Sequence, residues 1–298
     1  MDRRQFLRTS AAGAAGLLMP GGLLAATVPD VAVVKGLPGA ATRAAVGLLG
    51  GMAAFVKPGQ RVVIKPNMSF ASPAEAGANT HPLVVQALAA LCWEAGAGSV
   101  LILDNTLAPS RLCLEASGIP EAAAAVRPGM VFTMDDAALY REVALPDGRT
   151  LTRSAVAREA LRADVLIAAP TAKSHSGTGV SLSLKGMMGL IADRGVLHGR
   201  GLDECIVDLC TLLKAQLTVV DATHVLSTGG PRGPGRVLDG QTVIASGDMV
   251  AADAFTVSAF PWYGRHFQPS QVGHIRLAHE RGIGRMDVEN LKVERLAL

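Results

Sequence analysis

The chain has 298 residues, of which 49% are hydrophobic and 18% charged. This length and composition are sufficient for a large buried core, and they exclude an intrinsically disordered chain. Without residues 1–26, the 28 basic and 25 acidic residues fall to 25 and 24. This near-neutral balance gives no indication of nucleic-acid binding.

The N-terminus, MDRRQFLRTSAAGAAGLLMPGGLLAA, has a twin arginine at Arg3 and Arg4 before a stretch rich in Ala, Gly and Leu. It resembles a twin-arginine (Tat) export signal, which predicts a signal peptide over residues 1–28, the Tat translocase as a partner and a periplasmic protein. Pro20 is unfavourable in a membrane helix, and we expect no stable transmembrane span elsewhere. Leu24 lies where cleavage needs a small residue, so an uncleaved signal that anchors the protein stays an alternative.

Residues 29–298 are predicted to form an α/β domain, as one unit or two lobes. Short runs rich in Val and Ile alternate with helical patterns, which is typical of a mostly parallel sheet flanked by helices. The expected strands are 30–34, 61–65, 99–104, 164–169, 217–221 and 241–245. The expected helices are 41–55, 82–95, 154–162, a short one from about residue 181, 202–213, 249–260 and 269–280. Residues 105–153 have weaker patterns and are expected to form a subsidiary lobe or an antiparallel extension.

Polar sequences follow five of the expected strands. They are KPNMSF from residue 65, DNT from 104, PTAKSHSGTG from 170, DATHVLSTGGPRGPG from 221 and SGDMVAAD from 246. In α/β sheets, ligands bind beyond the carboxyl ends of the strands. The sequence therefore predicts a binding site along one edge of the sheet, to which all five segments contribute.

The segment after the fourth strand combines positive charge, hydroxyl groups and glycines before an expected helix start. Backbone N–H groups and positive charge at such a place favour an anion. The spacing is not that of a P-loop, so a solvated loop before a capped helix is the alternative. The residues expected to hold an anionic ligand or cofactor are Lys65, Asn67, Lys173, Ser174, Gly177, Thr178, Gly179, Arg194 and Asp221.

Lys185 interrupts the apolar run VSLSLKGMMGLI. A lysine in such surroundings must pair, reach water or lose its proton. Lysines with a lowered pKa serve as nucleophiles and as attachment points for cofactors. The alternative is a stem that lies along apolar surface with its ammonium group in water.

His175 and His198 precede and follow Lys185, and neutral imidazoles can move protons or bind a metal. We predict His175, Lys185 and His198 as catalytic residues, and the two histidines as candidate metal ligands. Two histidines are an incomplete metal site. Further ligands would have to come from a bound cofactor, water, Asp221, His224 or His81.

Other polar residues are expected to have structural or surface roles. Asp248 is expected to cap a helix, whereas Asp253 is either a buried structural residue or a functional one. The loop GGPRGPG at residues 229–235 cannot form regular structure. Surface positions are expected for His266, His274 and His279.

The four cysteines form no C-x-x-C pair, so no intrinsic ferredoxin-type cluster is expected. Cys92 and Cys205 lie in apolar helical patterns, which favours buried free thiols. The alternative is a disulfide formed after export, which an oxidising compartment permits.

Seven motifs in order resemble the family of the domain of unknown function 362, over about residues 30–260. They are VVIKPNMSF, THP, AGAGSVLILD, ADVLIAAPTAKSHSGTGVSLSLKGMMGLI, RGVLHGRGLDECIVDL, VVDATH…GGPRGPG and VIASGDMVAADAF. The family name states no activity, and some members carry Tat leaders. Many members have ferredoxin-type cysteines, which this chain lacks. The usual Lys-Asn pair of the family is Lys185-Gly186 here, so any contact of that asparagine is lost or replaced.

A shorter segment resembles nickel-dependent lactate racemase, in which a His, a Lys that holds a nickel-pincer nucleotide covalently and a metal-binding His occur in this order. The analogous positions are His175, Lys185 and His198. The resemblance implies a metal or a nickel-pincer-like nucleotide as a candidate cofactor. The sequence thus favours a cofactor-dependent enzyme of the isomerase or oxidoreductase type. The alternatives are a periplasmic ligand- or cofactor-binding protein without catalysis and a partner subunit of an exported redox complex.

Overall fold

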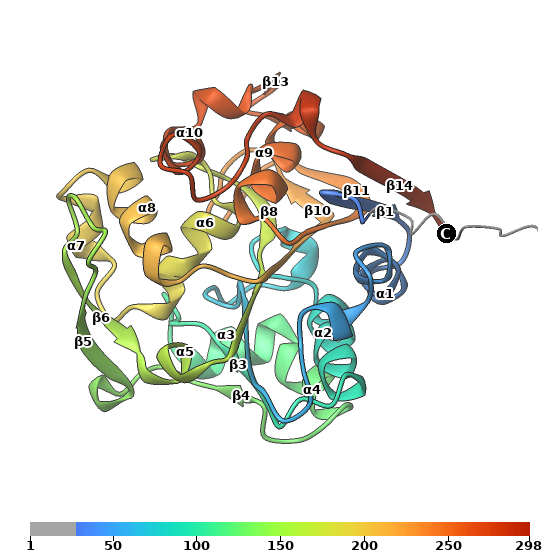
Figure 1. Cartoon of the computed structure of the whole chain (residues 1–298), viewed down its shortest axis with the longest axis horizontal. Coiled ribbons are helices and arrows are strands. Elements are labelled where there is room, and N and C mark those ends of the chain that lie inside the picture. The colour runs from blue at the N-terminus through green and yellow to red at the C-terminus, as the bar shows by residue number, and fades with distance from the viewer. Residues whose placement is uncertain (1–27) are drawn as a thin grey trace, which may run out of the picture.

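The computed structural model describes residues 28–298 (Figure 1). The predicted signal peptide, apart from Val28, therefore lies outside the described residues. Within residues 28–298, no helix has both the length and the apolar character that crossing a bilayer requires.

A mixed, mostly parallel sheet forms the centre of the fold, with the strand order β14-β1-β11-β10-β7-β2-β3-β4. These strands are β1 (Val31–Lys35), β2 (Arg61–Pro66), β3 (Ser99–Leu103), β4 (Val131–Phe132), β7 (Val165–Ala169), β10 (Leu217–Leu226), β11 (Val237–Ser246) and β14 (Val293–Ala297). Off this path, β8 (Thr171–His175) pairs with β10 and with β9 (Gly179–Val180). The α/β fold and the six expected strands are confirmed.

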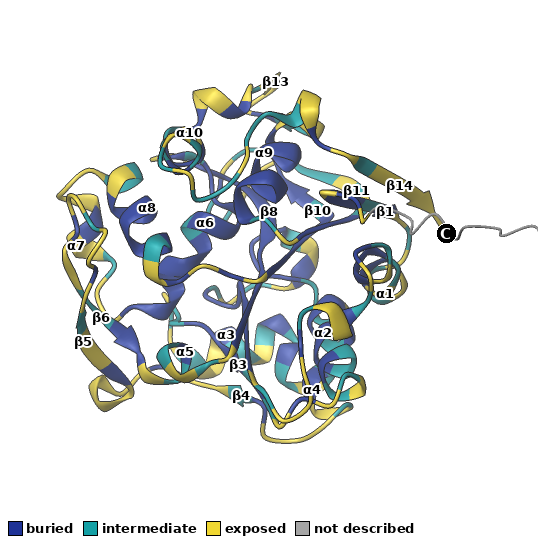
Figure 2. Cartoon of the chain, viewed as in Figure 1, coloured by how far each residue is buried: buried dark blue, intermediate teal, exposed yellow. Residues whose placement is uncertain are grey.

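Helices cover both faces of the sheet because alternate strand residues point to opposite sides. In β2, Val62 and Ile64 pack into the core under α1 (Pro38–Leu48), α2 (Pro82–Glu94) and α4 (Ile119–Ala124). Val63 between them packs into the core on the other face. The helices of that face are α6 (Leu182–Gly186), α8 (Leu202–Leu212), α9 (Met249–Ala259) and α10 (Gly273–Glu280). Figure 2 shows the buried residues concentrated between these layers.

Residues 105–153 contain α3 (Ser110–Ser117), α4, β4 and β5 (Tyr140–Ala144). β5 pairs in antiparallel orientation with β6 (Arg153–Ala157) in a two-stranded sheet of its own, so this hairpin does not extend the central sheet. The turn of this hairpin is held by Asp208 of α8, whose carboxylate accepts the backbone N–H groups of Arg149, Thr150 and Leu151.

The predicted helix over 154–162 is wrong in its first half. Residues 154–157 belong to β6, and only α5 (Arg158–Arg162) is helical. Val156 is fully buried in the core in this pairing. Tertiary burial of a β-branched residue here overrides the local helical pattern.

The prediction that five segments meet at one edge of the sheet is wrong for the last of them. β11 runs antiparallel to β10 and places Ser246 beside Thr218, near the start of β10. The segment after β11 therefore lies at the opposite edge from the carboxyl ends of β2 and β3. There Asp248 caps α9, as predicted, by accepting the N–H groups of Val250 and Ala251 at 2.8 and 3.2 Å.

The four cysteines are all buried and free, which confirms the expectation for Cys92 and Cys205. Burial raises the pKa of the Cys92 thiol to about 12. The side chain of His274 is fully buried as well, so its predicted surface position is wrong.

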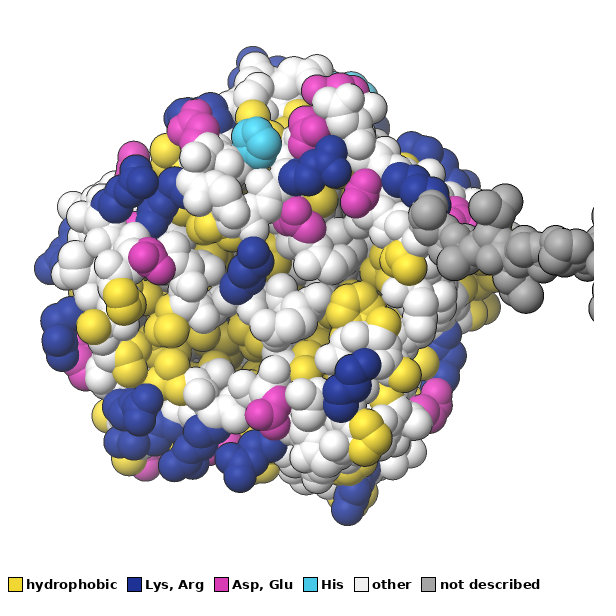
Figure 3. Space-filling model, viewed as in Figure 1, with side chains coloured by type: hydrophobic (Ala, Val, Ile, Leu, Met, Phe, Trp, Pro, Cys, Tyr) yellow, Lys and Arg dark blue, Asp and Glu magenta, His cyan; other side chains and the backbone are white. Residues whose placement is uncertain are grey.

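On the face of the molecule drawn in Figure 3, basic and acidic side chains are interspersed. This distribution agrees with the near-neutral composition.

Candidate functional site

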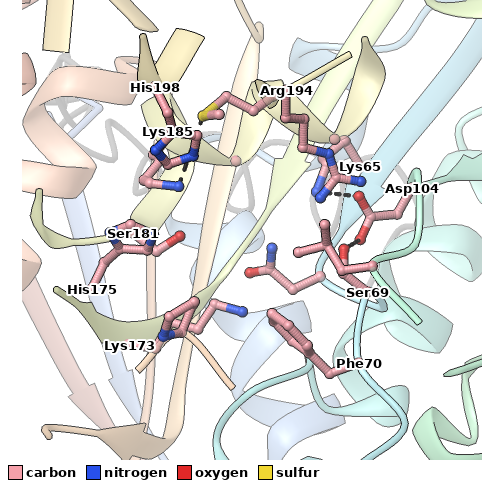
Figure 4. A pocket seen from close by; sticks show the side chains of 16 residues that line it. Lys65, Ser69, Phe70, Asp104, Lys173, His175, Ser181, Lys185, Arg194 and His198 are labelled. Carbon is pink, nitrogen blue, oxygen red and sulfur yellow. Dashed lines mark hydrogen bonds and ion pairs between the residues drawn. The ribbon is translucent and has the colours of Figure 1, made fainter. Parts of the chain in front are cut away.

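A pocket of about 230 Å³ lies at the carboxyl edge of the sheet, lined from the ends of β2, β3 and β8 and from the segment that follows β9 (Figure 4). The segment contributes α6, the 3₁₀ turn Met187–Leu190 and α7 (Gly195–His198). The predicted site residues that line the pocket are Lys65, Asn67, Lys173, His175, Lys185, Arg194 and His198.

A buried ion pair forms one wall of the pocket. Lys65 Nζ lies 3.0 Å from Asp104 Oδ1, because the parallel strands β2 and β3 end side by side. Asp104 Oδ2 also accepts hydrogen bonds from Ser69 Oγ at 2.6 Å and from the Met68 amide at 2.9 Å. Burial lowers the pKa of Lys65, and the Asp104 carboxylate opposes this shift. The geometry keeps both charges in place at the base of the site.

The backbone of Gly189 packs directly against this ion pair. A Cβ atom at this position would collide with Asp104 Oδ1 and with Cε of Lys65. In contrast, a Cβ on Gly186, three residues earlier, would meet nothing within 4 Å. Glycine at residue 189 is therefore a packing requirement of the site.

Lys173 enters the pocket from β8 and is only 2% exposed. Its ammonium donates a hydrogen bond to the carbonyl of Ala78 and lies 4.9 Å from the centre of the Phe70 ring. Burial, and next the charge of Lys65, lower the pKa of Lys173 to about 7. Its charge can therefore change near neutral pH.

Lys185 projects from the short helix α6, whose first turn is anchored by a buried acid. Asp253 of α9 accepts hydrogen bonds from the amide and hydroxyl of Ser183, at 2.9 and 2.7 Å, and from the amide of Leu184 at 2.9 Å. Lys185 Nζ lies 3.7 Å from Met188 Sδ, which is a weak acceptor. Burial, with the charges of Arg194 and Lys65, lowers the pKa of Lys185 to about 8.

His175 and His198 lie on the same side of the pocket as Lys185, opposite Lys65 and Asp104 (Figure 4). His175 Nδ1 accepts the amide N–H of Gly177 at 3.1 Å, which assigns the proton of the neutral ring to Nε2. Burial and the Lys185 charge lower the pKa of His175 to about 3. His198, in α7, is exposed.

Arg194 precedes α7 and carries a polar atom without a partner. Its Nη2 is buried and has no hydrogen-bond acceptor among residues 28–298. Together with Lys65, Lys173 and Lys185 it gives the pocket four cationic side chains, whereas Asp104 is the acidic side chain in its lining. The pocket therefore presents an excess of positive charge to any ligand.

The glycine-rich segment has a different role from the predicted loop before a helix. It forms the turn between β8 and β9, in which the amides of Gly177 and Thr178 bond to the ring and the carbonyl of His175. Gly179 has a φ of +77°, which favours glycine. The amides of Gly177 and Thr178 thus hold the hairpin that positions His175.

Ser174 and Asp221 lie outside the pocket lining. The Ser174 hydroxyl accepts the amide of Gly230 at 3.0 Å, which ties β8 to the loop at 229–235. Asp221 accepts the amide of His81 at 2.6 Å and the Thr223 hydroxyl at 2.6 Å. Both side chains are therefore engaged in holding loops together.

The side chains named as further metal ligands gather away from the pocket lining. The rings of His81 and His224 are stacked at 6.3 Å between centroids, and Asp221 bonds to the His81 backbone. In the part of the chain that the structure describes, no group of three or more His, Cys, Asp and Glu side chains could hold a metal ion.

Sequence reasoning did not select Asp104, Ser69 or Phe70. The sequence does contain an indication for Asp104, since it is the first residue of one of the polar segments that follow the strands. Its role as the partner of Lys65 depends on the pairing of β2 with β3, which local sequence does not specify.

Residues 62–258 match the family model described as Domain of unknown function (DUF362), and residues 1–20 match the twin-arginine translocation pathway signal sequence. The Thylakoid-associated protein sll1697 of Synechocystis sp. is 27% identical over 192 residues, which cover 61% of this chain and 58% of that protein. The lactate racemase apoprotein from Thermoanaerobacterium thermosaccharolyticum is a structural relative with a TM-score of 0.45 and 12% identity, over 74% of this chain and 55% of that chain. The chain thus spans less than two thirds of the length of either protein.

Proposed function

Because the chain belongs to the DUF362 family, whose name states no activity, we propose its function from the pocket: it binds a small anionic ligand or cofactor and acts as a cofactor-dependent enzyme through Lys185. The Tat signal supports export, so this chemistry would take place in the periplasm. The observation that carries the proposal is the buried Arg194 Nη2, which has no acceptor within residues 28–298.

The charges of the pocket favour an anion. Asp104 neutralises Lys65, but Lys173 and Lys185 have a carbonyl and a thioether as their hydrogen-bond acceptors. Unneutralised cations in a partly buried site are costly, and a carboxylate, phosphate or sulfate group removes that cost by accepting charge-assisted hydrogen bonds. Arg194, whose planar guanidinium can bind two oxygens at once, is suited to such a group.

Lys185 supports a covalent or polarising role. Its lowered pKa of about 8 leaves a fraction of the amine neutral near neutral pH, and a neutral amine is the nucleophilic form of lysine. His175, neutral with its proton on Nε2, can donate a hydrogen bond to a ligand oxygen. Lys185 would attach or polarise the ligand, His175 would orient it, and Arg194 and Lys173 would hold its acidic group.

The residues fit a cofactor that brings its own reactive centre and an acidic group. The cations would hold the acidic group and Lys185 would attach the cofactor. Such a cofactor, when bound, would supply the chemistry for an isomerase or an oxidoreductase. The described residues contain no cluster of three metal ligands, so a metal would need additional donors from the cofactor.

Sulfate is a suitable probe because its charge is constant around neutral pH. We expect isothermal titration calorimetry to show one saturable sulfate site per chain. Replacing Arg194 with glutamine should weaken sulfate binding by about 10-fold or more, since a hydrogen bond between charged groups contributes about 1.5–3 kcal/mol. The matched control is Arg200→Gln, an exposed arginine just after α7, which should leave the affinity unchanged. Equal affinities in wild type and R194Q, or no binding, would contradict the proposal.

A further inference from the structure

One side of the pocket mouth is apolar, in contrast to the charged interior. Phe70, Leu107 and Pro231 line the pocket together with its cations. Lys65 and Lys173 are each 2% exposed, whereas Leu107 is 60% exposed, and Phe70 and Pro231 are half-buried. A residue that lines a pocket and is also exposed lies where the pocket opens to solvent. The interior and this side of the mouth therefore favour different chemical groups.

Phe70 is held in a fixed position by a buried amide side chain. Asn79, which is fully buried, accepts the Phe70 amide with Oδ1 at 3.3 Å and donates from Nδ2 to the Phe70 carbonyl at 2.8 Å. The Phe70 ring lies 4.9 Å from the Lys173 ammonium. Figure 4 shows the ring beside Lys173, at the end of the pocket away from Arg194. An apolar ring is thus placed next to a cation that has no carboxylate partner.

Leu107 is connected through the backbone to the ion pair at the base of the site. Its amide donates a hydrogen bond to the carbonyl of Ser69 at 2.9 Å, and Ser69 Oγ donates to Asp104 Oδ2 at 2.6 Å. Single exposed leucines are common on protein surfaces. Leu107 differs from these because its backbone is anchored to the site and its side chain lines the pocket together with Phe70.

The pocket has space for more than an acidic group. Its volume of about 230 Å³ is several times the roughly 30 Å³ that one water molecule occupies in the liquid. A bound inorganic anion would leave the apolar side of the mouth in contact with water. A ligand that covers this side gains affinity, by about 4-fold for each methylene group that it buries.

We propose that the ligand of this pocket is an organic anion with an apolar body. The cations hold its acidic group in the interior, and the body lies at the mouth against Phe70, Leu107 and Pro231. The inference rests on the proposed function, because it takes the anion site as given. It adds the class of ligand, and it assigns to Leu107 and Phe70 the selection of organic over inorganic anions.

The test compares methyl sulfate with n-butyl sulfate, which have the same acidic group and the same single negative charge. Isothermal titration calorimetry measures both affinities on the full chain in sulfate-free buffer. We expect wild type to bind n-butyl sulfate about 10-fold more tightly than methyl sulfate, because three additional methylene groups are partly buried at the mouth. The ratio of the two affinities cancels any general change in the site that holds the acidic group.

Leu107→Ser should lower this ratio to about 3-fold or less, because it replaces apolar contact with a hydroxyl group. Leu107→Met keeps an apolar side chain and should retain the ratio of wild type. The matched control is Leu112→Ser in α3, since Leu112 is also exposed, at 46%, and lies outside the pocket lining. It should keep both affinities. The three replaced side chains are exposed, and circular dichroism verifies that each variant is folded.

The outcomes separate this inference from the proposed function. If inorganic sulfate and methyl sulfate bind but n-butyl sulfate binds no more tightly, the anion site stands and the apolar body is wrong. A ratio in L107S equal to that of wild type would overturn the inference as well, because the body would then lie elsewhere. If none of the three anions binds, both proposals are wrong.

Discussion

Lys173 and Lys185 reach the pocket from β8 and α6, and both are predominantly surrounded by protein. Burial is the first cause of the lowered pKa of each, to about 7 for Lys173 and about 8 for Lys185, and other cations of the pocket act in the same direction. The positive charge of these two lysines is therefore complete below these values and is lost as the pH rises through them. Ligand binding and proton uptake should be coupled.

Sulfate affinity should fall as the pH rises. We expect roughly a 10-fold loss between about pH 6 and pH 9, because each lysine that loses its proton removes a charge-assisted hydrogen bond. The loss of sulfate affinity should extend above pH 8, because bound sulfate stabilises the charged form of the lysines and so raises their pKa. Calorimetry at several pH values measures it, and Lys173→Met should bind more weakly at pH 6 with a flatter dependence on pH. An affinity that is constant or rises with pH would show that these lysines do not bind the anion.

At the residue scale, the sequence predicts the lysines, Arg194 and the two histidines of the pocket because they follow the ends of strands or flank Lys185. Lys185 in an apolar run is the clearest example. Asp104 is not predicted as a site residue, because its environment arises from the pairing of β2 with β3. This pairing joins residues far apart in the chain.

At the element scale, α6 and the 3₁₀ turn after it hold Lys185 against the sheet. Gly186 and Gly189 lie in this segment but have different surroundings. Gly189 contacts the Lys65–Asp104 pair, whereas Gly186 has free space where a Cβ would lie. The two glycines therefore form a matched pair for a stability measurement.

Gly189→Ala should lower the free energy of unfolding by about 1–3 kcal/mol, because its methyl group must displace a buried ion pair. Gly186→Ala should change it by about 1 kcal/mol or less, and in the stabilising direction, because alanine is the better helix former. Urea denaturation followed by circular dichroism measures both. Equal losses in the two variants would mean that Gly189 has no special contact with the ion pair.

The order of elements along the chain could be predicted from the Val/Ile runs and the helical periods between them. The direction of β11 could not, because a strand sequence has the same pattern in both directions and only the connection decides its orientation. The helix expected over 154–162 is wrong at β6 for a related reason, since pairing with β5 outweighs the local preference for a helix. Both errors concern long-range pairing.

At the scale of the whole molecule, the sheet concentrates the polar ends of several parallel strands in one pocket, while Asp248 and the start of α9 lie at the opposite edge. The Tat signal at residues 1–20 supports export, and the Tat pathway transports folded proteins. A chain that folds around its ligand in the cytoplasm would keep it during transport. We therefore expect the exported protein to carry a bound ligand.

Native and intact mass spectrometry, with metal analysis, of protein exported from its own host is the most direct test of an anionic ligand held at Lys185. The account predicts one added mass per chain in wild type and in the control Lys57→Met, whose lysine is exposed. It predicts loss of this mass in Lys185→Met with the fold retained. The bare polypeptide mass in wild type, with no bound metal, would contradict the account.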